Sequence, residues 1–368
     1  IYGKIDSIKG GAVGINVDDG TGDSSVDTTS TVGEQPFNIV LLHQKLIPLG
    51  RFFAIGHDSP EARNPLGNNL WAKQAYLFVH FCLFGENLRY KDSLALFVQQ
   101  LAHEPLSEDL FKKCFKVGYA DMEKQLRGYI LNTRHKYQKY TLDPANKLDS
   151  QAIDLSDATP ATVGLIKGDA LRLAGKSAAA VAEYRTAYAR GAREPALLAG
   201  YGEAELALGN KDRAHALLDA ASQAGVDRPS AYVRLAELRL ADGKASPRGP
   251  NGQLDSGQVG AVLTPLFKAR NFPPPLPETY KLIAETWSVS AVQPSVGNLA
   301  VLDEGIRKFP RQSPLLYQSA QLYQRIGQNE QAASIARLGI RFPADATAKA
   351  QFEQLLATLP PPPANPTK

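Results

Sequence analysis

The sequence is poor in cysteine, with only Cys82 and Cys114 among its 368 residues. Both cysteines lie among aromatic and aliphatic residues, the surroundings in which free thiols are usually buried. We therefore predict two buried thiols in place of a disulfide. Methionine is scarcer still, because Met122 is the only one and the chain begins at Ile1. We expect residues upstream of Ile1, which leaves any signal peptide, and hence the compartment, open.

Long apolar runs and an excess of one charge are missing too. The longest strongly apolar run, Ala75 to Phe84, is about half as long as a membrane-spanning helix. Basic and acidic side chains number 41 and 37, and the bases are scattered among the acids. We predict no transmembrane segment in this chain and no nucleic-acid binding, which would need a basic stripe. An apolar fraction of 43% is typical of a globular protein.

The N-terminal residues 1–35 are rich in glycine, serine and threonine. Seven glycines lie here, and six acids against two lysines give the segment a net charge of −4. It cannot bury enough apolar area to offset its ordering entropy, so we predict a flexible segment with at most a short strand near Ala12–Val17. The acidic run over residues 16–23 has the wrong spacing for a calcium loop, and we interpret it as a solvated turn.

The sequence contains, in contrast, a clear repeat of 34 residues. Five pairs of positions recur at this spacing: Gly168 and Gly202, Gly175 and Gly209, Ala180 and Ala214, Ala187 and Ala221, and Pro195 and Pro229. Small residues let two helices approach closely, and glycine suits a left-handed turn between them. The register predicts antiparallel helix pairs stacked into an α-solenoid, an architecture that provides a binding surface.

This repeat predicts about five helix pairs over residues 161–345. The small residue recurs as Gly168, Gly202, Ala236, Ala284 and Ala320, and the turn glycine as Gly175, Gly209, Gly243 and Gly327. Residues 244–258 are rich in glycine, proline and serine, so we predict a surface loop there, with the second helix resuming near Val259. Residues 346–368 are interpreted as a terminal helix and a proline-rich tail.

Residues 160–345 resemble the tetratricopeptide (TPR) family. The resemblance rests on a small residue, a turn glycine, an alanine, a large residue and a second alanine, in the order Gly168, Gly175, Ala180, Tyr184 and Ala187. The chain departs from the family pattern at Gly164, Glu205 and Arg239, where large apolar residues are expected, and we expect looser packing there. The resemblance implies an all-α solenoid whose concave surface binds a protein or peptide.

The sequence pattern of residues 36–140 predicts a small helical domain. Helices are expected over residues 37–49, 70–84, 91–102 and 121–131, with a further one that begins after a capping serine, Ser107. The second half of the helix over residues 70–84 is apolar on every side, so this helix should lie at the centre of the domain. Residues 141–160 follow as a linker into the repeats.

Residues 36–131 of this helical domain resemble a second family. The segments 70–80, 107–111 and 121–130 are similar to the C-terminal helical part of gluzincin-type (peptidase MA-like) zinc metallopeptidase domains that carry TPR tails. In that family a helix with the motif His-Glu-x-x-His supplies two zinc ligands and the general base. The resemblance implies that this helix lies upstream of Ile1. It also implies a periplasmic or secreted location, with a cytoplasmic one left open.

No histidine of this chain completes such a zinc site. His103 and Glu104 are followed by Pro105, which would break the helix, and the second histidine is absent. His80 lies in the apolar helix and is interpreted as a hydrogen-bonded core residue. The other histidines are isolated from further ligand types: His43, His57, His135 and His215. We assign no catalytic residue, metal ligand or cofactor to this chain, and zinc only to a motif upstream of it.

One position of the repeat predicts a partner-binding site. The residue that follows the small one is acidic in four units: Asp169, Glu203, Glu237 and Glu285. Stacking would align these acids on the concave face as a negative strip, suited to a basic segment or a free amine. The alternative is that the four acids form a solvated face without a ligand.

Two functions follow from these patterns. The first is a non-catalytic protein interaction scaffold that uses the concave TPR surface. The alternative is the C-terminal portion of a zinc metallopeptidase, whose repeats would recruit substrate or partner proteins. An upstream His-Glu-x-x-His motif would favour the peptidase, and an initiator methionine directly before Ile1 would remove it.

Overall fold

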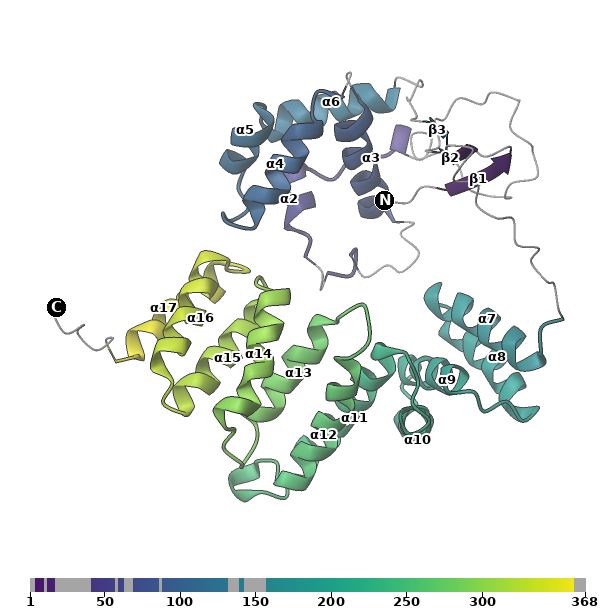
Figure 1. The fold of residues 1–368 in the computed structure, drawn as a ribbon, viewed down its shortest axis with the longest axis vertical. Helices are drawn as coiled ribbons and strands as arrows, with labels where there is room; N and C mark the ends of the chain where they lie inside the picture. Colours follow the sequence, from purple (N-terminus) through teal and green to yellow (C-terminus); the bar gives the residue numbers. More distant parts are fainter. Residues whose placement is uncertain are drawn as a thin grey trace. The chain divides into compact units, whose positions relative to one another are not determined.

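The computed structural model describes residues 4–9, 12–16, 41–56, 59–62, 69–85, 88–131, 139–141 and 157–360. The chain divides into two compact units, Ile1–Leu155 and Ser156–Lys368 (Figure 1). We call the helices of the first unit the helical domain and the second unit the array. No helix within the described ranges is long and apolar enough to cross a membrane.

The helical domain contains α-helices close to the predicted ranges. Their bounds are α2 (Leu49–Ala54), α3 (Leu70–Phe84), α4 (Lys91–Leu101), α5 (Glu108–Phe115) and α6 (Tyr119–Leu131). Ser107 caps α5 as predicted, because its Oγ accepts a hydrogen bond from the backbone N–H of Leu110 at 3.1 Å. Local signals therefore placed most of these helices correctly.

The predicted helix over residues 37–49 is wrong in its C-terminal part. Residues 44–48 are not helical, and α2 begins at Leu49, directly after Pro48. Proline lacks an N–H, but the first residues of a helix leave their N–H groups without intrahelical partners anyway. Pro48, which lies inside the predicted range 37–49, therefore precedes a helix, and its carbonyl accepts a hydrogen bond from the N–H of Phe52 at 2.8 Å.

Aromatic rings form the core of the helical domain. Phe111 and Phe115 stack with their ring centroids 4.3 Å apart. Phe97 meets these two rings edge-on, at 5.5 and 5.4 Å, and Phe78 lies 5.9 Å from Phe115. The helix that supplies Phe78, α3, is largely but not completely enclosed, because Val79 is 38% exposed.

His80 and the two cysteines have the buried environments that the sequence predicts. The His80 side chain is buried, and its Nδ1 lies 2.8 Å from the hydroxyl oxygen of Tyr129. Cys82 and Cys114 are buried and free. Burial raises the pKa of the Cys82 thiol to about 12, so this thiol stays protonated and unreactive at neutral pH.

A small antiparallel sheet belongs to the first unit. Its strands β1 (Lys4–Lys9), β2 (Ala12–Asn16) and β3 (Lys139–Thr141) pair in the order β1-β2-β3. The strand β2 lies where the sequence predicts a short strand. The strand β1 was not predicted, because it lies in the glycine-rich segment for which we expected at most one short strand. The strand β3 was not predicted either, because three residues show no period. The acidic turn expected over residues 16–23 lies outside the described residues beyond Asn16, as does most of the segment expected to be flexible.

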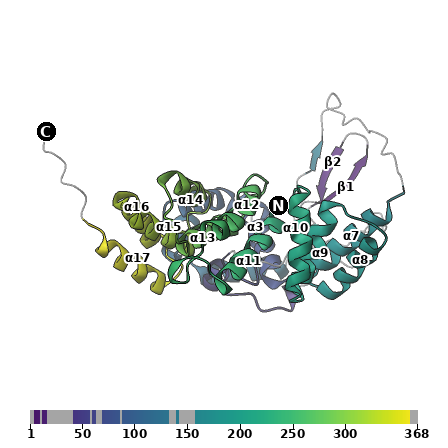
Figure 2. The same ribbon diagram turned by 90° about the horizontal axis from the view of Figure 1, so that it is seen from below.

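The array consists of helix pairs that follow one another along the second unit (Figures 1 and 2). The first three pairs are α7 (Pro160–Leu173) with α8 (Ser177–Ala189), α9 (Pro195–Ala207) with α10 (Lys211–Gln223), and α11 (Pro229–Ala245) with α12 (Ser256–Ala269). Then come α13 (Pro277–Ser288) with α14 (Val296–Lys308), α15 (Ser313–Arg325) with α16 (Asn329–Arg341), and a last helix, α17 (Ala346–Thr358). The predicted solenoid of about five pairs is confirmed.

In the array, small residues lie at close helix contacts and a turn glycine adopts a left-handed conformation, as the register predicts. A Cβ added to Gly168 would lie 2.4 Å from the ring of Tyr184, and one added to Gly202 would lie 2.8 Å from Leu218. These contacts leave no room for a larger residue where the two helices of a pair touch. Gly175, with a φ of +73°, occupies the left-handed turn between α7 and α8.

The insert in the third pair differs from the prediction. Gly243 lies within α11 and not in a turn, because α11 continues to Ala245. The segment that follows is not a plain surface loop, since Leu254 is 1% exposed and pairs through a β-bridge with Ser290. The second helix resumes at Ser256, three residues earlier than expected, because Asp255 caps it by accepting a hydrogen bond from the Gln258 N–H at 2.7 Å.

At two of the positions where the chain departs from the TPR pattern, the side chain forms an ion pair. Glu205 is fully buried and accepts hydrogen bonds from Asn210 at 2.6 Å and Arg213 at 3.0 Å. Burial by itself would raise the pKa of Glu205, but these hydrogen bonds outweigh it and lower the pKa below its usual value. Arg239 pairs with Asp219 at 2.5 Å. Charged side chains thus take positions at which the family has large apolar ones.

Candidate functional site

The four predicted acids lie on the first helices of consecutive pairs. Asp169 is on α7, Glu203 on α9, Glu237 on α11 and Glu285 on α13. Each of them is already engaged by a basic side chain of the array, as the distances below show. The strip that they form is therefore balanced in charge and not negative.

The first two acids belong to a partly buried ionic cluster. Arg228, the residue before α11, donates to Asp169 Oδ2 at 2.7 Å, across 59 residues of sequence. Tyr184 donates to Asp169 Oδ1 at 2.7 Å, and Arg172 lies 3.0 Å from Glu203 Oε2. We call this cluster the Arg228 network, and its members are Asp169, Arg172, Tyr184, Glu203, Arg228 and Ser230.

The Arg228 network holds Asp169 in the ionised form. Burial by itself would raise the pKa of Asp169, but hydrogen bonds from Arg228 and Tyr184 outweigh it and hold this pKa below its usual value. Glu203 has a side chain that is 8% exposed and also accepts a hydrogen bond from Ser230 at 2.5 Å. These two acids therefore join the first three helix pairs to one another and are poorly accessible to a ligand.

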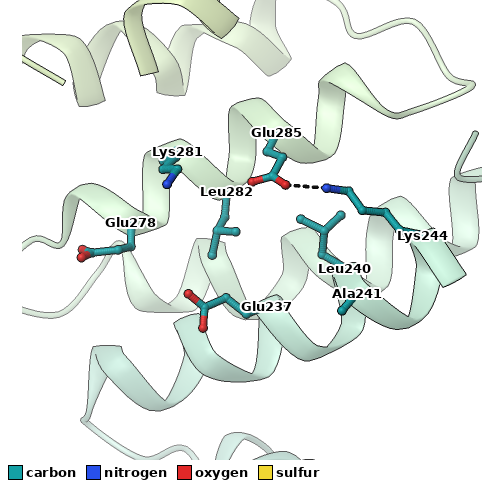
Figure 3. A pocket seen from close by; sticks show the side chains of 8 residues that line it. All are labelled: Glu237, Leu240, Ala241, Lys244, Glu278, Lys281, Leu282 and Glu285. Carbon is teal, nitrogen blue, oxygen red and sulfur yellow. Dashed lines mark hydrogen bonds and ion pairs between the residues drawn. The ribbon is translucent and has the colours of Figure 1, made fainter. Parts of the chain in front are cut away.

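The other two acids line a groove between α11 and α13 (Figure 3). This α11–α13 groove has a volume of about 320 Å³, and it is lined by Glu237, Leu240, Ala241, Lys244, Glu278, Lys281, Leu282 and Glu285. Leu240 and Leu282 are largely buried and give it an apolar base. The charged side chains surround that base, three of them acidic and two basic.

Two acids on the rim of the groove, Glu285 and Glu237, form ion pairs. Lys244 Nζ lies 2.5 Å from Glu285 Oε1 and joins the two helices across the groove, as the dashed line in Figure 3 marks. Arg234 lies 2.7 Å from Glu237, one turn away on the same helix. Lys281 projects from α13 beside the groove and is exposed. The groove thus offers carboxylates and an ammonium group around an apolar base.

Sequence reasoning identified Glu237 and Glu285 but missed the lysines of the groove. Helical spacing could have found Glu278 and Lys281, which lie seven and four residues before Glu285 on the same helix. Lys244 could not have been found, because it lies in the segment that we expected to be a surface loop. The extension of α11 to Ala245 brings Lys244 to the groove.

A second hollow, of about 350 Å³, lies in the helical domain beside Arg127. One of its polar side chains is occupied internally, because Arg127 donates to the backbone carbonyl of Leu41 at 3.2 Å and to that of Gln44. In the part of the chain that the structure describes, no three histidine, cysteine or acidic side chains are grouped as metal ligands. Our expectation that the chain binds no cofactor stays a prediction.

Comparisons with known proteins return solved structures of TPR proteins. One is YrrB, described as a TPR protein with an unusual peptide-binding site: 13% identity, 52% of this chain and 90% of that chain covered, TM-score 0.41. A thermophilic TPR protein of Thermus thermophilus, TTC0263, shows 17% identity, 53% and 97% coverage and a TM-score of 0.35. The TPR2AB domain of yeast Sti1, in complex with pHSP90, shows 13% identity, 54% and 97% coverage and a TM-score of 0.24.

No family model matches the chain. No curated protein matches it significantly. None of the comparisons supports the resemblance of residues 36–131 to zinc metallopeptidase domains. The helix pairs and their 34-residue register define the array as a TPR-type α-solenoid.

Proposed function

We propose that this protein is a protein interaction scaffold whose α11–α13 groove holds a segment of a partner protein. The observation that supports this most is the composition of the groove, which combines an apolar base with a rim of both charges on the first helices of two pairs. Open grooves of this kind fix an extended segment through one or two apolar side chains, and their charges set specificity.

The charges of the groove define the partner segment. An apolar side chain would rest on Leu240 and Leu282, with a basic residue beside it facing Glu237 and an acidic one facing Lys281. A purely basic segment, as we expected from the four acids, is less well matched because two lysines share the rim. Of the four acids, we assign Glu237 and Glu285 to the partner, and Asp169 and Glu203 to joining the helix pairs.

Selection of peptides from a displayed library on the full chain tests this proposal. We expect enriched peptides to share an apolar residue flanked by opposite charges. Lys281→Glu should weaken their binding by about tenfold, because it replaces an attraction with a repulsion worth about 1.4 kcal/mol. Lys349→Glu, an exposed lysine of α17 outside the groove, is the matched control and should bind as the wild type does. Equal binding by the Lys281→Glu and wild-type chains would remove the groove as the binding site.

A further inference from the structure

The first helix of the array exposes an apolar stripe. Ile166 is 61% exposed, Leu173 40% and Val163 37%, and the neighbouring Ala170 is exposed as well. These four residues recur at helical spacing on the side of α7 opposite Gly168, the residue that packs on Tyr184. We call this surface the α7 end face.

Two positions of the stripe, those of Val163 and Ala170, are buried in every later pair. The position of Ile166 is buried in two later pairs only, as Gly200 and Leu282, and that of Leu173 is buried in none of them. Counted from the small residue of each repeat, Val163 corresponds to Leu197, Ala231, Thr279 and Leu315, all at most 1% exposed. Ala170 corresponds to Ala204, Leu238, Thr286 and Leu322, all at most 6% exposed. At the positions of Val163 and Ala170, the α7 end face therefore matches the junction between two helix pairs.

In the later pairs, both helices of the preceding pair pack on the next first helix. The helices α8, α10, α12 and α14 each pack on the next first helix. At Gly200 of α9, for example, an added Cβ would lie 2.5 Å from the hydroxyl oxygen of Tyr184 on α8. The second helix of the preceding pair is thus part of the cover in each of the four junctions. The far end of the array differs, because α17 exposes small and polar residues such as Lys349, Gln351 and Glu353.

We propose that the α7 end face binds an amphipathic helix of a partner protein, which takes the place of the second helix of a preceding pair. The four junctions within the array establish this mode of packing, and the α7 end face continues it. Lys167 lies on the edge of the stripe and is exposed, so the partner helix would carry an acidic residue beside its apolar face.

A second copy of the chain fits this face less well. Head-to-tail stacking would press the α7 end face against α17, whose outer surface is polar. In a symmetric pairing the α7 end face meets its own copy. Asp169, the one acid of α7, is already paired with Arg228, so the copy offers Lys167 no acidic partner. The charge at this edge therefore favours a different partner.

The test measures the binding of a labelled helical peptide to the full chain by fluorescence anisotropy. The probe has the sequence of residues 294–309, which contain α14, the helix that packs on α15 in the last junction. We expect saturable binding. The double variant Val163→Asp/Ala170→Asp, at the two positions that are buried in every later pair, should reduce the affinity at least about tenfold, because each aspartate would have to be desolvated against apolar groups.

Two control variants separate this site from other effects. Leu208→Asp alters an apolar residue of similar exposure, 44%, elsewhere in the array, and Lys281→Glu alters the α11–α13 groove. Both should bind the probe as the wild type does, and circular dichroism should show unchanged helicity for every variant. Absence of probe binding, or equal binding by the Val163→Asp/Ala170→Asp chain, would overturn the proposal. So would light scattering that shows a dimer dissociated by these two substitutions, because the second copy would then be the occupant.

Discussion

The helical domain and the array bury their cores in opposite ways. In the helical domain, one cluster of aromatic rings, including Phe97, Phe111 and Phe115, is assembled once and has no period. In the array, each pair repeats the same close contact at a small residue, as Gly168 does with Tyr184. Repetition of the inner contacts leaves the outer side chains of the array free to differ, so the α11–α13 groove and the α7 end face could arise without a change of fold.

The largest effect is expected from the aromatic cluster of the helical domain. Phe111→Ala removes a fully buried ring, so we expect this unit to lose about 3–5 kcal/mol of unfolding free energy. Because the two units are separately compact, the transition of the array should remain in place. Urea unfolding followed by circular dichroism and by tryptophan fluorescence checks this, since Trp71 lies in the helical domain and Trp287 in the array. If Phe111→Ala shifted the unfolding transitions of the helical domain and of the array together, the two cores would not be independent.

A smaller loss is expected when a glycine at a repeat contact becomes alanine. In Gly168→Ala the new methyl group would lie 2.4 Å from the buried Tyr184 ring, and overpacking of this kind costs about 1–3 kcal/mol. The matched control is Gly128→Ala in α6, where an added Cβ meets nothing within 4 Å. That change should stabilise the helical domain by roughly 0.5–1 kcal/mol. If both substitutions changed the melting temperature in the same direction, close contact at the repeat glycines would not distinguish the array from the helical domain.

The smallest of the three effects concerns the Arg228 network and depends on pH. Arg228→Gln leaves the partly buried Asp169 with one fewer donor, and we expect a loss of about 1–2 kcal/mol from the array at neutral pH. Because the folded pKa of Asp169 is lowered, its contribution is present above the unfolded pKa and is lost as the pH falls through the folded value. The difference between wild type and variant, measured by urea unfolding from pH 7 downward, should therefore shrink below about pH 4. A difference that stays constant with pH would point to lost packing.

Much of the fold could be predicted because its signals are local. The bounds of α3 follow from an apolar run between a capping asparagine, Asn69, and Gly85. The helix pairs follow from the 34-residue register. The start of α2 could not be predicted, because Pro48 suits either side of a helix boundary. Leu254 was missed for another reason, since a single leucine in a segment rich in glycine and proline gives no sign that it is buried.

The site was predicted only in part, because partners in an ion pair need not be near in sequence. The register placed Asp169, Glu203, Glu237 and Glu285 on consecutive first helices, as the structure has them. It could not show that Arg228 reaches Asp169 across 59 residues, or that Lys244 reaches Glu285 across 41. We therefore predicted that the four acids form a negative strip without knowing which basic side chains pair with them.

The sequence by itself determined that this protein carries stacked helix pairs, because small residues, turn glycines and helix starts act within one or two turns of the chain. Only the tertiary structure decided which acids are paired with basic side chains, where a groove opens between α11 and α13, and which apolar side chains of α7 are exposed. These properties depend on how one pair is placed on the next. Placement is set by contacts between residues tens of positions apart, which a local period does not record.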